Sequence, residues 1–193
     1  MTKSEFRKVY LARQKSFSAE EREMKSFRIA ELFFQNFDLS KINFLHLFLP
    51  IEKFNEIDTR PIFEILWRKF PNIKTLVPRV NFQTNEIENL KFSIETETAK
   101  NLWEIFEPTH DEIIAAEKID AVLVPLLCFD GQGFRVGYGK GFYDKFLKNC
   151  RTNCLKIGLN YFAPIEKISD VDDFDVALDF CVTPDRVWKF STR

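Results

Sequence analysis

The first forty residues alternate apolar and charged positions at helical spacing. Thr2-Lys3-Ser4-Glu5 has the form of a capping box, in which a hydroxyl and a glutamate three positions later satisfy backbone donors at a helix start. Ser18-Ala19-Glu20-Glu21 repeats this form. Apolar residues then recur three or four positions apart, at Phe6, Val9, Tyr10 and Phe17, and at Met24, Phe27, Ala30, Phe34 and Phe37. The pattern predicts two successive amphipathic helices.

Continuous apolar runs mark the predicted strands. The runs at 44–49, 73–77 and 121–124 lack polar alternation, as expected of strands covered on both faces, and prolines at 50 and 78 are expected to end the first two. The remaining pattern predicts strands at 90–94, 155–159 and 180–183, helices at 59–70, 111–118 and 143–150, a turn-rich segment at 81–89 and an acidic loop at 170–179. Alternating helices and strands predict one α/β domain over residues 1–193, built on a largely parallel sheet.

Glycine is concentrated in the stretch from Ala121 to Leu147, where an apolar run leads through a loop into an amphipathic helix. Five of the six glycines lie there, at 131, 133, 137, 139 and 141. Glycine allows positive φ and lets a backbone approach a ligand closely. A strand-to-helix junction of this kind points backbone N–H groups outward, and a helix N-terminus favours anions.

Two cations, Arg135 and Lys140, are interleaved with these glycines. The arginine suits bidentate contact with phosphate and the lysine acts as a point charge, so phosphate binding is favoured over a tight turn without a ligand. The loop lacks both the Gly-Lys-Ser/Thr ending of Walker A and the Gly-x-Gly-x-x-Gly spacing of dinucleotide-binding folds. It therefore indicates a polyphosphate without identifying the nucleotide.

Charged residues outside the loop have two interpretations each. Asp144 lies one turn into the following helix, where it is either a Mg²⁺ ligand between protein and phosphates or a complement to the helix N-terminus. The acidic loop offers candidates for a second carboxylate. Lys3 and Arg7 are i,i+4 neighbours, which by itself is typical of a solvated helix face.

Composition narrows the class of protein. Hydrophobic residues make up 45% and charged residues 30%, which is ordinary for a soluble globular chain. A net charge of -1 argues against nucleic-acid or membrane-surface binding through bulk electrostatics. No apolar run has transmembrane length and the N-terminus lacks a signal core, so a cytoplasmic protein is expected. The cysteines at 128, 150, 154 and 181 and the histidines at 46 and 110 form no recognisable metal or hydrolase motif, and reduced thiols are expected.

The stretch from Val124 to Leu147 resembles the 5-formyltetrahydrofolate cyclo-ligases, also called methenyltetrahydrofolate synthetases. It has the family pattern of Pro, then Phe-Asp, then Gly-x-Arg-hydrophobic-Gly-x-Gly-x-Gly-aromatic-Tyr-Asp. Shorter matches follow in the family's order, at Lys3-x-x-x-Arg7, Glu56-Ile-Asp-Thr, Pro78-Arg79, Trp103 before Glu107-Pro108, and Asp175-x-x-x-Asp179. The resemblance spans nearly the whole chain and implies a three-layer α/β/α fold, similar to that of sugar-phosphate isomerases and CoA-transferases.

The resemblance also implies an activity. In this family ATP, with Mg²⁺, phosphorylates the formyl oxygen of 5-formyltetrahydrofolate. The neighbouring folate nitrogen attacks the activated carbon, and loss of phosphate gives 5,10-methenyltetrahydrofolate, with ADP as the other product. A monomer acting on the small molecule, with or without a polyglutamate tail, is expected.

Carried over by position, the resemblance assigns most of the site. The expected ATP contacts are Lys3, Arg7, Gly133, Phe134, Arg135, Val136, Gly137, Tyr138, Gly139, Lys140, Gly141 and Phe142. The expected folate contacts are Ile51, Glu56, Phe82, Trp103, Tyr138 and Tyr143, where core packing is the alternative for the aromatic residues. Arg135, Lys140 and Tyr143 are the expected catalytic residues, and Asp144 and Asp175 the expected Mg²⁺ ligands. Phe142 stands where many members have a tyrosine, so one hydroxyl is missing.

Two other classes remain alternatives. A non-catalytic folate- or nucleotide-binding protein on the same scaffold would be expected to have lost Asp144 or Glu56, and both are present. A sugar-phosphate isomerase or CoA-transferase relative would share the fold but need no ATP. Dependence of the activity on ATP separates that class from the cyclo-ligase.

Overall fold

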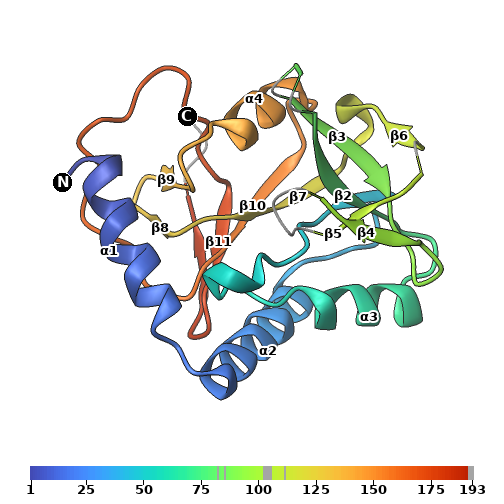
Figure 1. The fold of residues 1–193 in the computed structure, drawn as a ribbon, viewed down its shortest axis with the longest axis horizontal. Coiled ribbons are helices and arrows are strands. Elements are labelled where there is room, and N and C mark those ends of the chain that lie inside the picture. Colours follow the sequence, from blue (N-terminus) through green and yellow to red (C-terminus); the bar gives the residue numbers. More distant parts are fainter. Residues whose placement is uncertain (82, 85, 102–105, 111, 191–193) are drawn as a thin grey trace.

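A mixed sheet of eight strands forms the middle of the protein, for which a computed structural model describes residues 1–81, 83–84, 86–101, 106–110 and 112–190 (Figure 1). Its centre consists of five parallel strands: β11 (Phe180–Val182), β10 (Leu155–Leu159), β7 (Ala121–Pro125), β1 (Phe44–His46) and β2 (Lys74–Asn81). Antiparallel strands lie at the edges: β12 (Val187–Lys189) beside β11, and β3 (Glu86–Lys91) and then β6 (Ile113–Ile114) beyond β2.

Helices cover both faces of this sheet, which confirms the predicted α/β fold. In Figure 1, α2 (Ala19–Asn36) and α3 (Arg60–Lys69) lie on one side of the sheet and α4 (Phe142–Asn149) on the other. Alternate residues of β7 serve the two sides: Leu123 belongs to the core cluster with α2 and α3, whereas Val122 and Val124 belong to the cluster with α4. All three are fully buried, which explains why the run is continuously apolar.

The candidate site follows from the order of the strands. β1 and β7 are parallel neighbours, with Leu45 opposite Ala121. Their carboxyl ends therefore lie at the same edge of the sheet, and the segments that leave them must emerge side by side. After β1 the chain forms a short 3-10 helix, η1 (Glu52–Phe54), and after β7 it enters the glycine loop.

Both predicted capping boxes are present, but the predicted apolar faces were only partly right. Thr2 and Ser18 accept from the backbones of Glu5 and Glu21, at the starts of α1 (Lys3–Lys15) and α2. Val9, Met24 and Phe27 are exposed, whereas Gln14 and Ser26 are buried. Gln14 and Ser26 are buried because they form polar contacts with other elements. The periodicity of the sequence alone does not reveal such contacts.

Other predicted boundaries needed correction. β2 continues through Pro78, which pairs with Asn89 of β3, so the segment 81–89 that was predicted to be turn-rich contains most of a strand. The predicted helix at 111–118 was wrong, because β6 and the 3-10 helix η2 (Ala116–Lys118) occupy its described part. Pairing with β3 overrides local helix propensity there. Unpredicted short strands are β4 (Thr98–Lys100), β5 (Phe106–Pro108), β8 (Cys128–Phe129), β9 (Arg135–Val136) and β12.

Within the described residues, no helix has both the length and the apolar character that spanning a membrane requires.

His46, at the end of β1, is a buried polar residue in the core. Its ring centroid lies 4.8 Å from that of Phe146 and 6.1 Å from that of Tyr143. Within the described residues neither ring nitrogen has a hydrogen-bond partner, and burial lowers the pKa of His46 to about 3. The imidazole is therefore neutral in the folded protein.

This burial predicts a specific pH dependence. Below an ordinary pKa of 6.5 the unfolded chain binds a proton at His46 that the folded chain does not, so folding stability falls as the pH drops from 6.5 towards 3. Changing His46→Leu removes this penalty. We expect the free energy of unfolding of the variant to exceed that of the wild type by an additional ~1.4 kcal/mol per pH unit below 6.5.

Urea unfolding of both proteins at pH 7, 6 and 5 checks this. Because other titrating groups are shared, they cancel in the difference between the two curves. Parallel curves over this range would contradict the buried, neutral histidine.

Candidate active site

The glycine loop has the unusual backbone that its composition predicted. φ is +86° at Gly133, +94° at Gly139 and +69° at Gly141. A Cβ atom at Gly133 would lie 2.8 Å from the carbonyl oxygen of Leu178, and one at Gly139 would lie 3.0 Å from the guanidinium carbon of Arg7. Both glycines have a left-handed conformation that other residues rarely adopt. At Gly133 an added Cβ would also meet fixed backbone, whereas at Gly139 it would press on the end of the Arg7 side chain.

The loop also presents an open helix end. β8 and β9 form a hairpin, the chain then passes through 137–141, and Gly141 is the N-cap residue of α4. Gly141 has no side chain with which to cap the helix, so the first N–H groups of α4 are left to other partners. Lys140, beside the cap, is exposed. Together these features provide donors and positive charge at one place.

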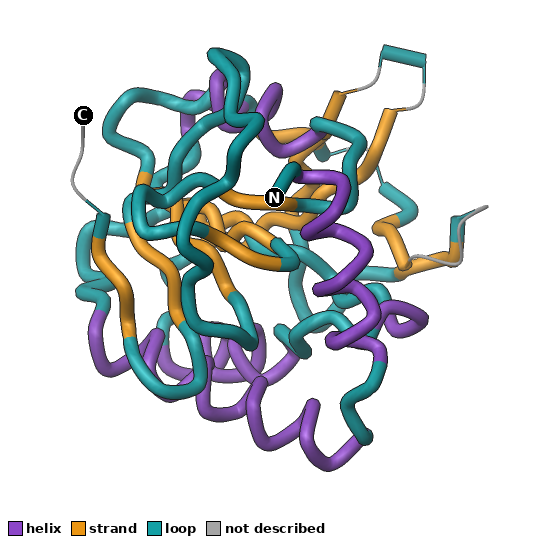
Figure 2. Tube along the Cα trace, turned by 90° about the vertical axis from the view of Figure 1, so that its left-hand side faces the viewer, coloured by secondary structure: helices purple, strands orange, loops and turns teal. Residues whose placement is uncertain are grey.

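Helix α1 packs across this loop and brings two distant cations to it. Figure 1 places α1 beside β8 and β9, and Figure 2 shows that it runs along the outside of the molecule. Arg7 Nε donates to the carbonyl oxygen of Gly137 at 2.9 Å. Phe6, one position earlier, is buried in a small cluster with Val136 of β9. Arg7 therefore faces the glycine loop and does not lie on a purely solvated helix face.

Lys3 connects the start of α1 to the acidic loop. Its Nζ lies 2.5 Å from Asp175 Oδ2 and 3.5 Å from Asp172 Oδ2, and its backbone N–H donates to Asp170 at 2.7 Å. Burial alone would lower the pKa of Lys3, but the hydrogen bond and charge of Asp175, with a smaller contribution from Asp172, outweigh this and raise it. Lys3 therefore remains a cation held by carboxylates.

Arg135 and Asp144 form a second ion pair, in which the arginine is buried and the carboxylate is 28% exposed. The Arg135 side chain is only 5% exposed, and its Nη2 lies 2.8 Å from Asp144 Oδ1. Its Nη1 donates to the carbonyl oxygen of Val176, while the Val176 N–H donates to Asp144 Oδ1 at 3.1 Å. Burial lowers the pKa of Arg135 and the charge of Asp144 opposes that shift. The pair joins the start of α4 to the residue that follows Asp175.

The segment after β1 provides a buried carboxylate. Glu56 is 5% exposed and accepts from the Ile51 N–H at 2.8 Å, and the nearby hydroxyl of Tyr138 lowers the pKa of its carboxyl. Burial raises the pKa of Glu56 to about 7. The hydrogen bonds from Ile51 and Tyr138 and the charge of Arg22 lower the pKa but do not offset the effect of burial. A carboxyl with this pKa changes its charge near neutral pH.

Two tyrosines lie around this carboxylate. The ring of Tyr138 stacks on Phe54, with centroids 5.2 Å apart and planes at 18°. The buried hydroxyl of Tyr143 has no hydrogen-bond partner in the part of the chain that the structure describes. Burial raises the pKa of Tyr143, the charge of Glu56 raises it further and that of Arg135 lowers it. Tyr143 therefore lies within electrostatic reach of both the glycine-loop side and the Glu56 side.

Other expected site residues have different surroundings. Val136 is buried, and Phe134 packs partly buried in the cluster around Phe6, so their side chains serve packing. Phe142, at the start of α4, is half-buried. Phe82 and Trp103 lie outside the described residues. The described residues contain no group of three or more His, Cys, Asp or Glu side chains that could together hold a metal ion.

Sequence reasoning missed three polar or aromatic residues of this site, Gln14, Arg22 and Phe54. Gln14 lies seven positions after Arg7, which places it on the same face of α1 two turns later. That spacing was the available signal. Arg22 and Phe54 had none, because they reach Glu56 and Tyr138 through tertiary packing.

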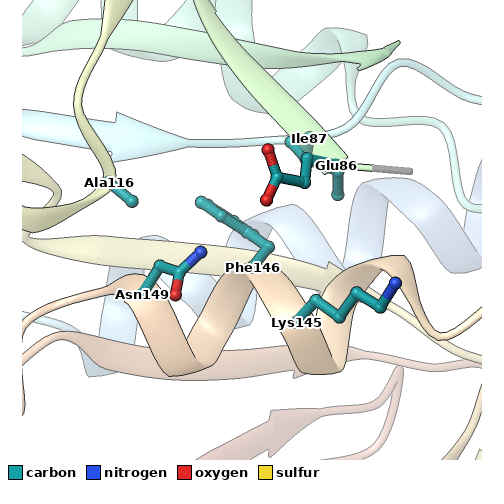
Figure 3. Close-up of a pocket in the computed structure, with 6 residues that line it drawn as sticks. All are labelled: Glu86, Ile87, Ala116, Lys145, Phe146 and Asn149. Atoms are coloured by element: carbon teal, nitrogen blue, oxygen red, sulfur yellow. The ribbon is translucent and has the colours of Figure 1, made fainter. Parts of the chain in front are cut away.

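Two cavities lie elsewhere on the protein. One, of about 60 Å³, is lined from β3 by Glu86 and Ile87, from α4 by Lys145, Phe146 and Asn149, and by Ala116 (Figure 3). The other, of about 310 Å³, lies beside Trp67 and Phe92. Neither is lined by a residue of the glycine loop. The assignment of the site therefore rests on side-chain chemistry and not on cavity size.

Comparisons with known proteins agree with this chemistry. A sequence model of the 5-formyltetrahydrofolate cyclo-ligase family matches residues 1–184. The chain is 31% identical over 140 residues to the 5-formyltetrahydrofolate cyclo-ligase of Escherichia coli (strain K12), covering 70% of this chain and 75% of that protein. It is 28% identical over 145 residues to the Mus musculus enzyme of the same name, covering 72% and 70%.

Solved structures show the same relationship. The NMR structure of Aquifex aeolicus 5,10-methenyltetrahydrofolate synthetase superposes with a TM-score of 0.83 at 29% identity, covering all 100% of this chain and 95% of that one. The structure of a 5,10-methenyltetrahydrofolate synthetase from Mycoplasma pneumoniae gives 0.74 at 26% identity, covering 94% and 98%. With its glycine loop, its paired charges and its buried Glu56, the chain belongs to the 5-formyltetrahydrofolate cyclo-ligase family of enzymes.

Proposed function

We propose that this protein catalyses the ATP- and Mg²⁺-dependent cyclisation of 5-formyltetrahydrofolate to 5,10-methenyltetrahydrofolate. The observation that carries the proposal is the contact between the glycine loop, which suits phosphate, and the segment after β1, which suits a folate ring. A glycine loop with cations and carboxylates, suited to a polyphosphate, includes Tyr138, whose ring stacks on Phe54 in the segment that also carries the buried carboxyl Glu56. The names of the related enzymes support the folate substrate.

The reaction needs an activated formyl oxygen. This oxygen attacks the γ-phosphorus of ATP, and the bond from that phosphorus to the ADP oxygen breaks. The neighbouring folate nitrogen then attacks the formyl carbon and loses its proton, and the carbon–oxygen bond breaks to release phosphate. An amide oxygen is a poor leaving group until it is phosphorylated. The protein contributes mainly alignment of the two substrates and neutralisation of negative charge.

The phosphate half consists of backbone and cations. The N–H groups of Gly133 and Phe134 already donate to Asp130, so the residues from Gly137 to Phe142 and the open N-terminus of α4 supply the N–H donors for the phosphates. Lys140 is exposed beside them, and Arg7 is already hydrogen-bonded to Gly137. Arg135 is buried and holds Asp144, so its positive charge would act on the phosphates while it keeps that carboxylate in position.

Asp144 and Asp175 fit a Mg²⁺ site of the kind that proteins build with few carboxylates. Mg²⁺ is usually bound through one or two carboxylates together with substrate phosphates and water, so two suffice. Val176, which donates to Asp144, directly follows Asp175 in the chain. When bound, Mg²⁺ would neutralise phosphate charge. Lys3, now paired with Asp175, would be released to contact phosphate.

The folate half is built around Glu56. A buried carboxylate suits the N–H donors on the edge of a pterin ring, and Ile51 and Tyr138 hold it in place. Tyr138 and Tyr143 provide aromatic walls against which a flat ring packs well. The hydroxyl of Tyr143, which has no hydrogen-bond partner among the described residues, is available to a substrate polar group. Phe82 and Trp103 remain expected contacts from the family resemblance.

The proposed function predicts a direct assay result. With MgATP and 5-formyltetrahydrofolate, the protein should produce the absorbance of 5,10-methenyltetrahydrofolate together with stoichiometric ADP and phosphate, and omission of ATP should abolish the product. Folate binding measured by calorimetry without any ATP-dependent turnover would identify a binding protein instead. Turnover without ATP would point to the isomerase or transferase class.

The magnesium assignment predicts a difference between two neighbouring acidic residues. Asp175→Asn should lower kcat/KM by about 10²-fold and raise the Mg²⁺ concentration needed for half-maximal activity, because a ligand and its charge are lost. Asp173→Asn makes the same chemical change at an exposed position of the same segment and should leave activity within about two-fold. Equal behaviour of the two variants in Mg²⁺ titrations would refute the assignment.

The glycine loop predicts a second pair of variants. Gly139→Ala forces a side chain into a left-handed conformation and against Arg7, which should cost roughly 1–3 kcal/mol and raise the KM for ATP. Gly131→Ala is the matched control, since no described atom outside its chain neighbours lies within 4 Å of the added carbon and its φ is not positive. Thermal unfolding and ATP kinetics compare the two, and an undisturbed Gly139→Ala protein would contradict the close approach.

A further inference from the structure

Gln14 is a buried polar residue that takes no part in the proposed reaction steps. It is 2% exposed, near the end of α1, on the helix face that also carries Arg7. Buried amides are nearly always hydrogen-bonded, and their partners reveal what they hold in place. The partners of Gln14 come from the segment after β1 and from the glycine loop.

The orientation of the Gln14 amide is fixed by chemistry. Its Nε2 lies 2.8 Å from the carbonyl oxygen of Phe54 and 3.1 Å from the hydroxyl oxygen of Tyr138. A carbonyl oxygen can only accept, so the NH₂ end of the amide must face Phe54. The two hydrogens on Nε2 are then used by these two contacts, one by each.

This orientation fixes the direction of the next hydrogen bond. Because Tyr138 Oη accepts a hydrogen from Gln14, its own hydrogen is free to point towards the Glu56 carboxyl, whose pKa this hydroxyl lowers. Glu56 also accepts from the Ile51 N–H. The chain of donors therefore runs from Gln14 through Tyr138 to Glu56, and it ends on a carboxylate that has two donors.

We infer that Gln14 is a positioning residue, which acts through Tyr138 to keep Glu56 aligned and ionised as an acceptor for the substrate. This inference rests on the proposed function, in which Glu56 binds the folate ring. It adds a role for α1, because the helix that carries Lys3 and Arg7 towards the phosphates also orients the carboxyl on the folate side. Gln14 itself need not touch either substrate.

The charges around Glu56 determine how the inference appears in a pH profile. The groups that act on it or feel its charge come from separate elements: Tyr138 in the glycine loop, Arg22 in α2, Tyr143 in α4 and Tyr161 after β10. Burial raises the pKa of Glu56 to about 7, and the hydrogen bond from Tyr138 limits that rise. Substrate binding that needs ionised Glu56 is lost as the pH falls through this value. Weakening the Tyr138 donor should therefore move the acid limb to higher pH.

Gln14→Leu tests the inference, because it removes both donors and replaces the amide with an apolar side chain of similar size. We expect the KM for 5-formyltetrahydrofolate to rise about ten-fold, the KM for ATP to stay within about two-fold, and the acid limb of kcat/KM to move upward. Tyr138→Phe breaks the same relay but keeps the ring on Phe54, so it should have a similar effect. In the Tyr138→Phe background, Gln14→Leu should add little.

Lys8→Leu, an exposed position on the same helix, is the control and should leave all three quantities unchanged. Additive effects of the Gln14 and Tyr138 changes, or equal rises in both KM values, would overturn the inference. A carbon-13 NMR titration of the Glu56 carboxyl needs no turnover and separates this inference from the proposed function. The pKa of Glu56 should be higher in Gln14→Leu and in Tyr138→Phe than in the wild type, and an unchanged pKa in either folded variant would refute the relay even in an active enzyme.

Discussion

The contact between α1 and the glycine loop is the constraint on which the rest of the site depends. The guanidinium of Arg7 lies against Gly139, 3.0 Å from the position that a Cβ atom there would take, and it is hydrogen-bonded to the carbonyl oxygen of Gly137. This close approach needs a glycine at positive φ. Because α1 is one continuous helix, fixing it at Arg7 also places Lys3 beside the acidic loop at one end and Gln14 beside Tyr138 at the other.

Charge in the site is balanced in pairs, and the two pairs differ in a way that matters for the proposed chemistry. Lys3 and Asp175 have side-chain exposures of 19% and 14%, whereas Arg135 is 5% exposed and its partner Asp144 is 28% exposed. Water can reach both charges of the Lys3–Asp175 pair, so breaking it costs less than leaving a buried charge without a partner. A buried arginine left without its carboxylate is costly, by about 3–5 kcal/mol. We therefore expect MgATP to replace the Lys3–Asp175 pair and to leave Arg135–Asp144 intact.

Short sequence motifs correctly predicted the features that depend only on neighbouring residues in the chain. Both capping boxes and the junction from glycine loop to α4 are confirmed, and the apolar runs do form parallel strands, although β1 ends at His46 and not at Pro50. The features that were wrong or missed depend on tertiary contacts. The segment 113–114 became a strand because β3 pairs with it, and β8 and β9 are too short to show a period. The burial of Gln14 and the inward pairing of Arg135 depend on elements more than a hundred residues apart or on packing around α4. The assigned roles of the site residues remain predictions.

The most direct test of the account is a crystal structure of the protein with Mg²⁺, a non-hydrolysable ATP analogue and a folate analogue. The account predicts phosphates against the backbone of 137–142, Mg²⁺ on Asp144 and Asp175, Lys3 moved from Asp175 to phosphate, and the pterin ring on Glu56. The Arg135–Asp144 pair should be unchanged. A nucleotide bound away from the glycine loop, with Lys3 still on Asp175, would contradict the account.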